Sequence, residues 1–218
     1  MTVLAINGSP RKKRNTATLL TKALEGAAAQ GAETELVHLY GLDYKGCVSC
    51  FACKTRGGKS YGTCGFNDGL TPILKKIADA DALIIGSPIY FGSVTGETRS
   101  FLERLLFPYL TYTVNYASLA PKRIATAFIY TMNLTEEQSK EYGYEYLFNS
   151  HERYLQLIFG QQAESLCSFD TYQFDDYSKV LMESYDPAKK AQRREEVFPQ
   201  DCQRAYELGA RLAGKGNK

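Results

Sequence analysis

Short apolar runs that end at turn-forming residues alternate along the chain with segments of helical periodicity. The run over residues 2–6 stops at Asn7-Gly8-Ser9-Pro10, and the run over 82–86 stops at Ser87-Pro88. Continuous apolar runs of this length are typical of strands buried on both faces of a parallel sheet. The same pattern predicts three more strands, over 35–39, 123–130 and 163–169.

Apolar residues recur every three or four positions between the predicted strands, so a helix is expected after each strand. Helices are expected over 17–28, 98–106 and 136–159, and over a charged closing segment, 193–214, that is interrupted near Pro199. Another helix is expected to start at Thr71-Pro72, with Thr71 as the N-cap and Pro72 as the first helical residue. Alternating strands and helices form a parallel sheet between two helix layers. We therefore predict an α/β three-layer sandwich with a five-stranded parallel sheet of order 2-1-3-4-5. Its ligand site is expected beside strands 1 and 3, at the carboxyl edge.

Composition restricts the possible partners. With 44% apolar residues among 218 and a formal net charge of +2, the chain suits one domain over 1–218. Its charge gives no reason to expect nucleic acid or an anionic membrane as partner. No apolar run approaches the ~20 residues that span a bilayer, and the first strand begins at Thr2, which leaves no room for a secretory signal. We therefore expect a cytoplasmic protein whose cysteines are thiols or metal or cluster ligands rather than disulfides.

The connection after the first predicted strand carries the residues of an anion site. Ser9, Asn15 and Thr16 supply side-chain donors, and Arg11 supplies a forked cation that suits phosphate oxygens. The helix that follows adds unpaired N–H groups and the positive end of its dipole. The spacing is neither G-x-G-x-x-G nor a Walker A loop. The alternative is a hydrophilic turn with a solvated basic run, which is what we expect for most of 12–14.

The segment after the third predicted strand, 86–96, is rich in glycine and aromatic residues. Pro88 stiffens it, Gly92 lets a planar ligand approach the backbone, and Tyr90 and Phe91 are placed to flank such a ligand. The alternative is an aromatic-rich turn that caps the core.

Together these two connections resemble the NADPH-dependent FMN reductase and iron–sulfur flavoprotein branch of the flavodoxin-like superfamily. Its members carry G-S-P-R followed by N-T after strand 1 and S-P-x-Y-x-G after strand 3, and both patterns are present here. The likeness covers 2–107 and also the segment DTYQFDDYSK at 170–179. It implies a flavodoxin-like fold and bound FMN, with the phosphate held by the loop that contains Ser9, Arg11, Asn15 and Thr16. The ring-contact residues that it implies are Pro88, Ile89, Tyr90, Phe91, Gly92, Thr131, Met132 and Asn133.

Four of the six cysteines, Cys47, Cys50, Cys53 and Cys64, are crowded into a loop at about 40–69. The iron–sulfur flavoproteins that the chain resembles hold a [4Fe–4S] cluster with a compact cysteine motif in this connection. Here the last gap is wider, at ten residues. Reduced thiols that pack the loop or line a substrate pocket are an alternative. Zinc is another, although it usually takes two separated C-x2-C pairs.

The resemblance implies an NAD(P)H-dependent oxidoreductase that passes electrons from NADPH or NADH through FMN to a small acceptor, such as a quinone, a nitro or azo compound, or free flavin. The protein supplies position and electrostatics for such chemistry, so no catalytic residue is assigned. The alternatives are an iron–sulfur flavoprotein that transfers electrons between a [4Fe–4S] cluster and FMN, and a non-enzymatic flavin-binding regulatory module. The family also implies a homodimer or homotetramer. The candidate interface is drawn from a group of aromatic residues: Tyr109, Tyr112, Tyr116, Tyr142, Tyr144, Tyr146 and Phe148.

Overall fold

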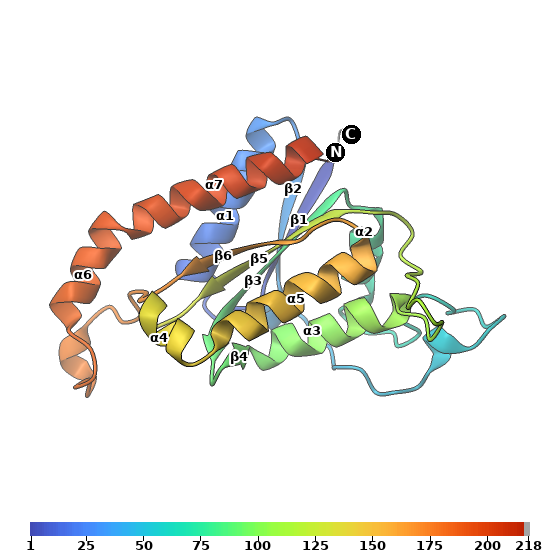
Figure 1. Ribbon diagram of the computed structural model, residues 1–218, viewed down its shortest axis with the longest axis horizontal. Coiled ribbons are helices and arrows are strands. Elements are labelled where there is room, and N and C mark those ends of the chain that lie inside the picture. The colour runs from blue at the N-terminus through green and yellow to red at the C-terminus, as the bar shows by residue number, and fades with distance from the viewer. Residues whose placement is uncertain (216–218) are drawn as a thin grey trace.

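Five parallel strands form the centre of the computed structural model, which describes residues 1–215 (Figure 1). They lie in the order β2 (Glu33–His38), β1 (Thr2–Asn7), β3 (Ala82–Tyr90), β5 (Ala125–Thr131) and β6 (Glu164–Ser168). Numbered among themselves, these strands have the predicted order 2-1-3-4-5, so the flavodoxin-like topology is confirmed. The carboxyl ends of all five strands therefore lie at one edge of the sheet.

A sixth strand, β4 (Ser93–Val94), pairs antiparallel with the end of β3. The predicted third strand ends at Gly86, whereas β3 continues to Tyr90 and turns back through β4. The segment expected as a loop is thus a β-hairpin that projects from the sheet edge.

Helices cover both faces of the sheet (Figure 1). One layer contains α1 (Asn15–Ala29) and α7 (Phe198–Lys215), and the other contains α2 (Thr71–Asp79), α3 (Gly96–Leu106) and α5 (Tyr144–Phe159). Alternate residues of each strand point to opposite layers. In β1, for example, Val3 packs toward the first layer and Leu4 toward the second.

Two predicted helices differ from those in the structure. The segment 136–159 forms α4 (Glu136–Glu141) and α5, because Gly143 between them adopts a left-handed conformation with φ of 72°. The closing segment begins earlier than predicted, with α6 (Pro187–Glu196), and it breaks before α7. Short 3-10 turns occur at Leu39–Gly41, Ala52–Lys54, Phe107–Tyr109 and Tyr177–Lys179. No helix within residues 1–215 has the length and apolar character needed to cross a membrane.

Candidate functional site

Hydrogen bonds join the three segments that were predicted to bind FMN. The Gly8 N–H donates to the Gly86 carbonyl at 2.8 Å, so the first connection is fastened to the end of β3. The hydroxyls of Thr16 and Thr131 lie 2.8 Å apart and connect the start of α1 to the end of β5. Residues from β1, β3 and β5 therefore meet at the carboxyl edge beside the topological switch point, where this fold binds ligands.

The close approach of these segments requires glycine at position 8. The Thr95 hydroxyl donates to the Gly8 carbonyl at 2.7 Å, and Thr95 also caps α3 by accepting from the Thr98 N–H. A Cβ at position 8 would lie 1.8 Å from Thr98 Oγ1. Neither threonine was predicted as a site residue, although a threonine directly before a helix is a recognisable N-cap signal.

The predicted phosphate loop is a compact turn at an uncapped helix start. The Ser9 N–H donates to Asn7 Oδ1 at 3.0 Å, and the Arg11 N–H donates to Ser9 Oγ at 3.2 Å. No side chain caps α1 at Arg14, and the first turn contains no acidic residue. The free N–H groups and the helix dipole at this point favour an anion.

The segment 170–179, here called the strap, crosses this loop and contacts its donors. Arg11 donates to the Gln173 carbonyl at 2.6 Å, and the Asn15 amide donates to the Tyr172 carbonyl at 2.9 Å. Arg14 forms an ion pair with Asp175, and this pairing holds the pKa of the Asp175 carboxyl below its usual range. The strap thus already occupies side chains that were predicted to reach the phosphate. Lys12 and Lys13 are exposed, as expected.

The predicted ring-contact residues Pro88–Gly92 form the end of β3 and the turn of its hairpin. Phe91 and Gly92 have φ angles of 48° and 76°, which is the left-handed pair that a two-residue hairpin turn requires. Tyr90 is exposed and Phe91 is fully exposed, whereas Ile89 packs against the core. The hairpin therefore presents two aromatic rings at the sheet edge.

The third predicted segment lies at the end of β5. Thr131 and Met132 are buried. Asn133 Oδ1 is buried without a hydrogen-bond partner within the described residues, so an acceptor is available at a predicted ring-contact position. Lys190 of α6, which is buried and paired with Asp170, donates to the Asn133 carbonyl at 3.3 Å. No pattern in the sequence pointed to this lysine.

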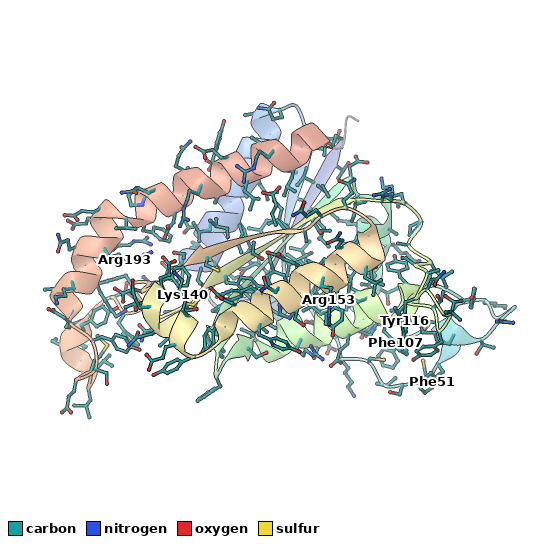
Figure 2. All side chains as sticks on the ribbon, viewed as in Figure 1. Phe51, Phe107, Tyr116, Lys140, Arg153 and Arg193 are labelled. Carbon is teal, nitrogen blue, oxygen red and sulfur yellow. The ribbon has the colours of Figure 1, made fainter. Side chains whose placement is uncertain are left out.

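All four clustered cysteines line one small cavity between their loop and α3. Cys64 lines this cavity together with Cys47, Cys50 and Cys53, although ten residues separate Cys53 from Cys64 in the sequence. Cys53 is buried, and burial raises the pKa of its thiol. Figure 2 shows Phe51 of this loop and Phe107, which follows α3, at the same end of the molecule, and both residues line the cavity. Within residues 1–215 no three His, Cys, Asp or Glu side chains are arranged to hold a metal ion, so the structure shows neither a zinc site nor a cluster site.

A buried arginine contacts the fourth cysteine. Arg104 donates from Nε to Cys64 Sγ at 2.9 Å and pairs with Asp68 at 2.8 Å. Burial works against the charged guanidinium, but the hydrogen bond to Asp68 and the interaction with Cys64 outweigh it and raise the pKa of Arg104. The sequence analysis did not identify this residue.

The aromatic residues of the candidate interface divide between core and surface. Tyr109 and Phe148 are buried, whereas the surface ones are Tyr112, Tyr116, Tyr142 and Tyr146. His151 of α5 is also buried, with Nδ1 2.8 Å from the Tyr130 hydroxyl. Burial lowers the pKa of His151 to about 4.

The sheet order, the anion loop after β1 and the aromatic hairpin after β3 define a flavodoxin-like protein. Residues 1–133, more than half of the chain, match the model of the NADPH-dependent FMN reductase family. The chain belongs to that family.

Known relatives agree with this assignment. The chain is 38% identical over 104 residues to an iron–sulfur flavoprotein of Methanocaldococcus jannaschii, a match over 48% of this chain and 51% of the relative. It is 41% identical over 104 residues to an iron–sulfur flavoprotein of Archaeoglobus fulgidus, over 48% of each chain. The chain thus spans about half the length of these curated relatives. Its fold is similar to that of the NAD(P)H:quinone oxidoreductase from Methanothermobacter marburgensis, with a TM-score of 0.68 and 15% identity over 97% of this chain and 98% of that one.

Proposed function

We propose that this protein is an FMN-dependent oxidoreductase that passes electrons from NADPH or NADH to a small acceptor such as a quinone, a nitro or azo compound, or free flavin. The observation that carries the proposal is the joining of three predicted flavin-binding segments at one sheet edge, through the Gly8–Gly86 and Thr16–Thr131 hydrogen bonds. Membership of the FMN reductase family supports it.

The residues at this edge fit FMN. The uncapped start of α1 and Arg11 suit a phosphate group. The exposed rings of Tyr90 and Phe91 suit a planar ring system, and the unpartnered Asn133 Oδ1 suits a ring N–H donor. Bound FMN would accept a hydride from the nicotinamide and release electrons to the acceptor, while the protein positions both.

Arg11 provides a sharp test of this site. Arg11→Ala removes a charge-assisted hydrogen bond to the phosphate, worth about 1.5–3 kcal/mol, so the FMN dissociation constant should rise by roughly 10- to 150-fold. Lys13→Ala is the matched control, because it removes the same charge from an exposed neighbour. FMN affinity is measured by quenching of flavin fluorescence, and turnover by NADPH consumption with a quinone. Equal affinity in the two variants would contradict the proposed phosphate site.

The second candidate function adds a [4Fe–4S] cluster that exchanges electrons with FMN. The observation in its favour is the convergence of all four cysteines on one cavity. Four thiolates are the usual ligand set of such a cluster, and the iron–sulfur flavoproteins among the relatives support it. Bound here, the cluster would supply one-electron chemistry next to α3.

Iron and sulfide analysis of anaerobically purified protein tests this second candidate. Cys64→Ser should reduce bound iron and sulfide strongly, whereas Cys202→Ser, in α7 and away from the cavity, should retain the wild-type content. Wild-type protein without iron and sulfide would eliminate the cluster and leave reduced thiols as the interpretation.

Three further predictions belong to the same proposal. We expect a homodimer or homotetramer with an aromatic interface, a cytoplasmic location, and no nucleic-acid or membrane partner. A flavin-binding module without activity is the lower alternative, and it predicts FMN binding with negligible NAD(P)H oxidation for every acceptor.

A further inference from the structure

Helix α3 and the 3-10 turn after it hold the cysteine loop through contacts at or beside three of its cysteines. The Cys47 N–H donates to Glu103 Oε2 at 3.3 Å, which fixes the first cysteine. Lys54, next to Cys53, donates to the Phe107 carbonyl and lies 4.3 Å from the Phe107 ring centroid. The position of the cysteine loop therefore depends on α3 and on the turn that follows it.

Arg104 is the third anchor, and its Nε–H donates to a cysteine sulfur, Cys64 Sγ, at 2.9 Å. Besides Cys64 Sγ and Asp68, its guanidinium donates to the Lys45 and Phe66 carbonyls, each at 2.9 Å. These acceptors lie before and after the ten-residue gap. Arg104 thus joins the two ends of the loop and brings Cys64 back to the first three cysteines.

We infer that Arg104 is a positioning residue for an iron–sulfur cluster: it sets the place of Cys64 and donates a charge-assisted hydrogen bond to that thiolate. This inference rests on the second candidate function. It explains how a motif with a ten-residue gap can still present four cysteines to one cavity. It also provides a buried cation beside a group of thiolates, which otherwise repel one another at close range.

The hydrogen bond has a consequence for the redox potential. Donors to a ligand sulfur stabilise the more negative, reduced state of a cluster, because they withdraw electron density from the sulfur. Removal of the Arg104 donor should therefore shift the midpoint potential of the cluster to a more negative value. A residue that only fills space would leave the potential unchanged.

The test uses anaerobically reconstituted full-length protein with two variants. Arg104→Gln together with Asp68→Asn removes both members of the buried pair, so that no charge is left unpaired. Arg104→Lys keeps the charge but lacks the planar fork. The matched control is Arg153→Gln, on the neighbouring helix α5, which removes one positive charge from an exposed side chain that does not line the cysteine cavity.

Iron and sulfide content and an EPR-monitored redox titration are the two measurements. We expect the double variant to bind less iron, with a more negative midpoint potential in the fraction that loads. Arg104→Lys should be intermediate, and Arg153→Gln should match the wild type. A double variant with wild-type iron content and potential would overturn the role of Arg104 while leaving the cluster in place. Wild-type protein without a cluster would overturn both, and FMN binding would then be judged separately by fluorescence.

Discussion

Replacing Gly8 with alanine tests whether the two flavin-binding connections must lie in direct contact. The new Cβ would sit 1.8 Å from Thr98 Oγ1 and 3.1 Å from the Gly86 carbonyl. The first distance is far below van der Waals contact, so either the phosphate loop or the start of α3 has to move. The phosphate loop carries Ser9 and Arg11 of the proposed FMN site, and the start of α3 directly follows the hairpin of the predicted ring-contact residues.

The size of the effect follows from overpacking in a buried region. Inserting a methyl group into a well-packed site costs about 1–3 kcal/mol. For a chain of 218 residues, each kcal/mol lowers the melting temperature by about 2–4 °C, so Gly8→Ala should lower it by about 2–12 °C. FMN affinity should also fall, because Ser9 and Arg11 follow directly along the displaced loop.

A double-mutant cycle identifies the cause. Thr98→Ala removes the clashing hydroxyl and its 2.8 Å contact with Thr95, at a cost of about 1 kcal/mol by itself. The combined variant Gly8→Ala with Thr98→Ala should be less destabilised than the sum of the two single variants. Gly96→Ala is the control, because a Cβ there meets no atom within 4 Å. Additive effects of the two single changes, measured by thermal and urea unfolding, would refute this reasoning.

Three other predictions concern pH, the strap and helix packing. Burial lowers the pKa of His151 to about 4. Below pH 6.5 the imidazole of the unfolded chain binds a proton that the buried imidazole of the folded chain does not bind. The free energy of unfolding therefore decreases as the pH falls from 6.5 to 4. His151→Gln should reduce this loss by roughly 3 kcal/mol at pH 4 in urea unfolding, and an unchanged pH dependence would contradict a neutral buried imidazole. Asp175→Asn removes the carboxylate that pairs with Arg14 beside the phosphate loop. It should tighten FMN binding by roughly two- to five-fold, because a negative charge next to an anion site repels the FMN phosphate. Weaker binding in a fluorescence titration would contradict this reasoning. Gly209→Ala places a Cβ 1.7 Å from the Ala23 carbonyl oxygen, where α7 packs against α1, and should lower the free energy of unfolding by about 1–3 kcal/mol. Gly214→Ala, where a new Cβ meets no atom within 4 Å, should change it little. Equal melting temperatures of the two variants would contradict this close helix contact.

The sheet could be predicted from the sequence because its strands are buried on both faces. Continuous apolar runs such as 82–86 have few other stable arrangements, and parallel strands with helical connections leave few topologies. The helix boundaries were less predictable. The break before α5 depends on one glycine in a left-handed conformation, Gly143, and such a residue inside an amphipathic pattern does not reveal whether the helix ends there.

Parts of the candidate site could be predicted only where the residues of one continuous segment suit a ligand by themselves. The loop with Ser9 and Arg11 and the segment with Tyr90 could be proposed as ligand-binding segments because their residue types suit a phosphate and a planar ring. The contacts of Arg104 with Cys64 and of Lys190 with Asp170 join residues far apart in the chain. No local pattern encodes such pairs, and a charged residue in a helix more often faces solvent.

The visible spectrum of protein purified without oxygen, before and after addition of NADPH, tests the central claim most directly. The account predicts two flavin bands that bleach when NADPH is added, with extra broad absorbance beside them if the cysteine cavity holds a cluster. A protein that is colourless, and that stays colourless after FMN is added and unbound flavin is removed, would contradict the assignment of the carboxyl edge as a flavin site.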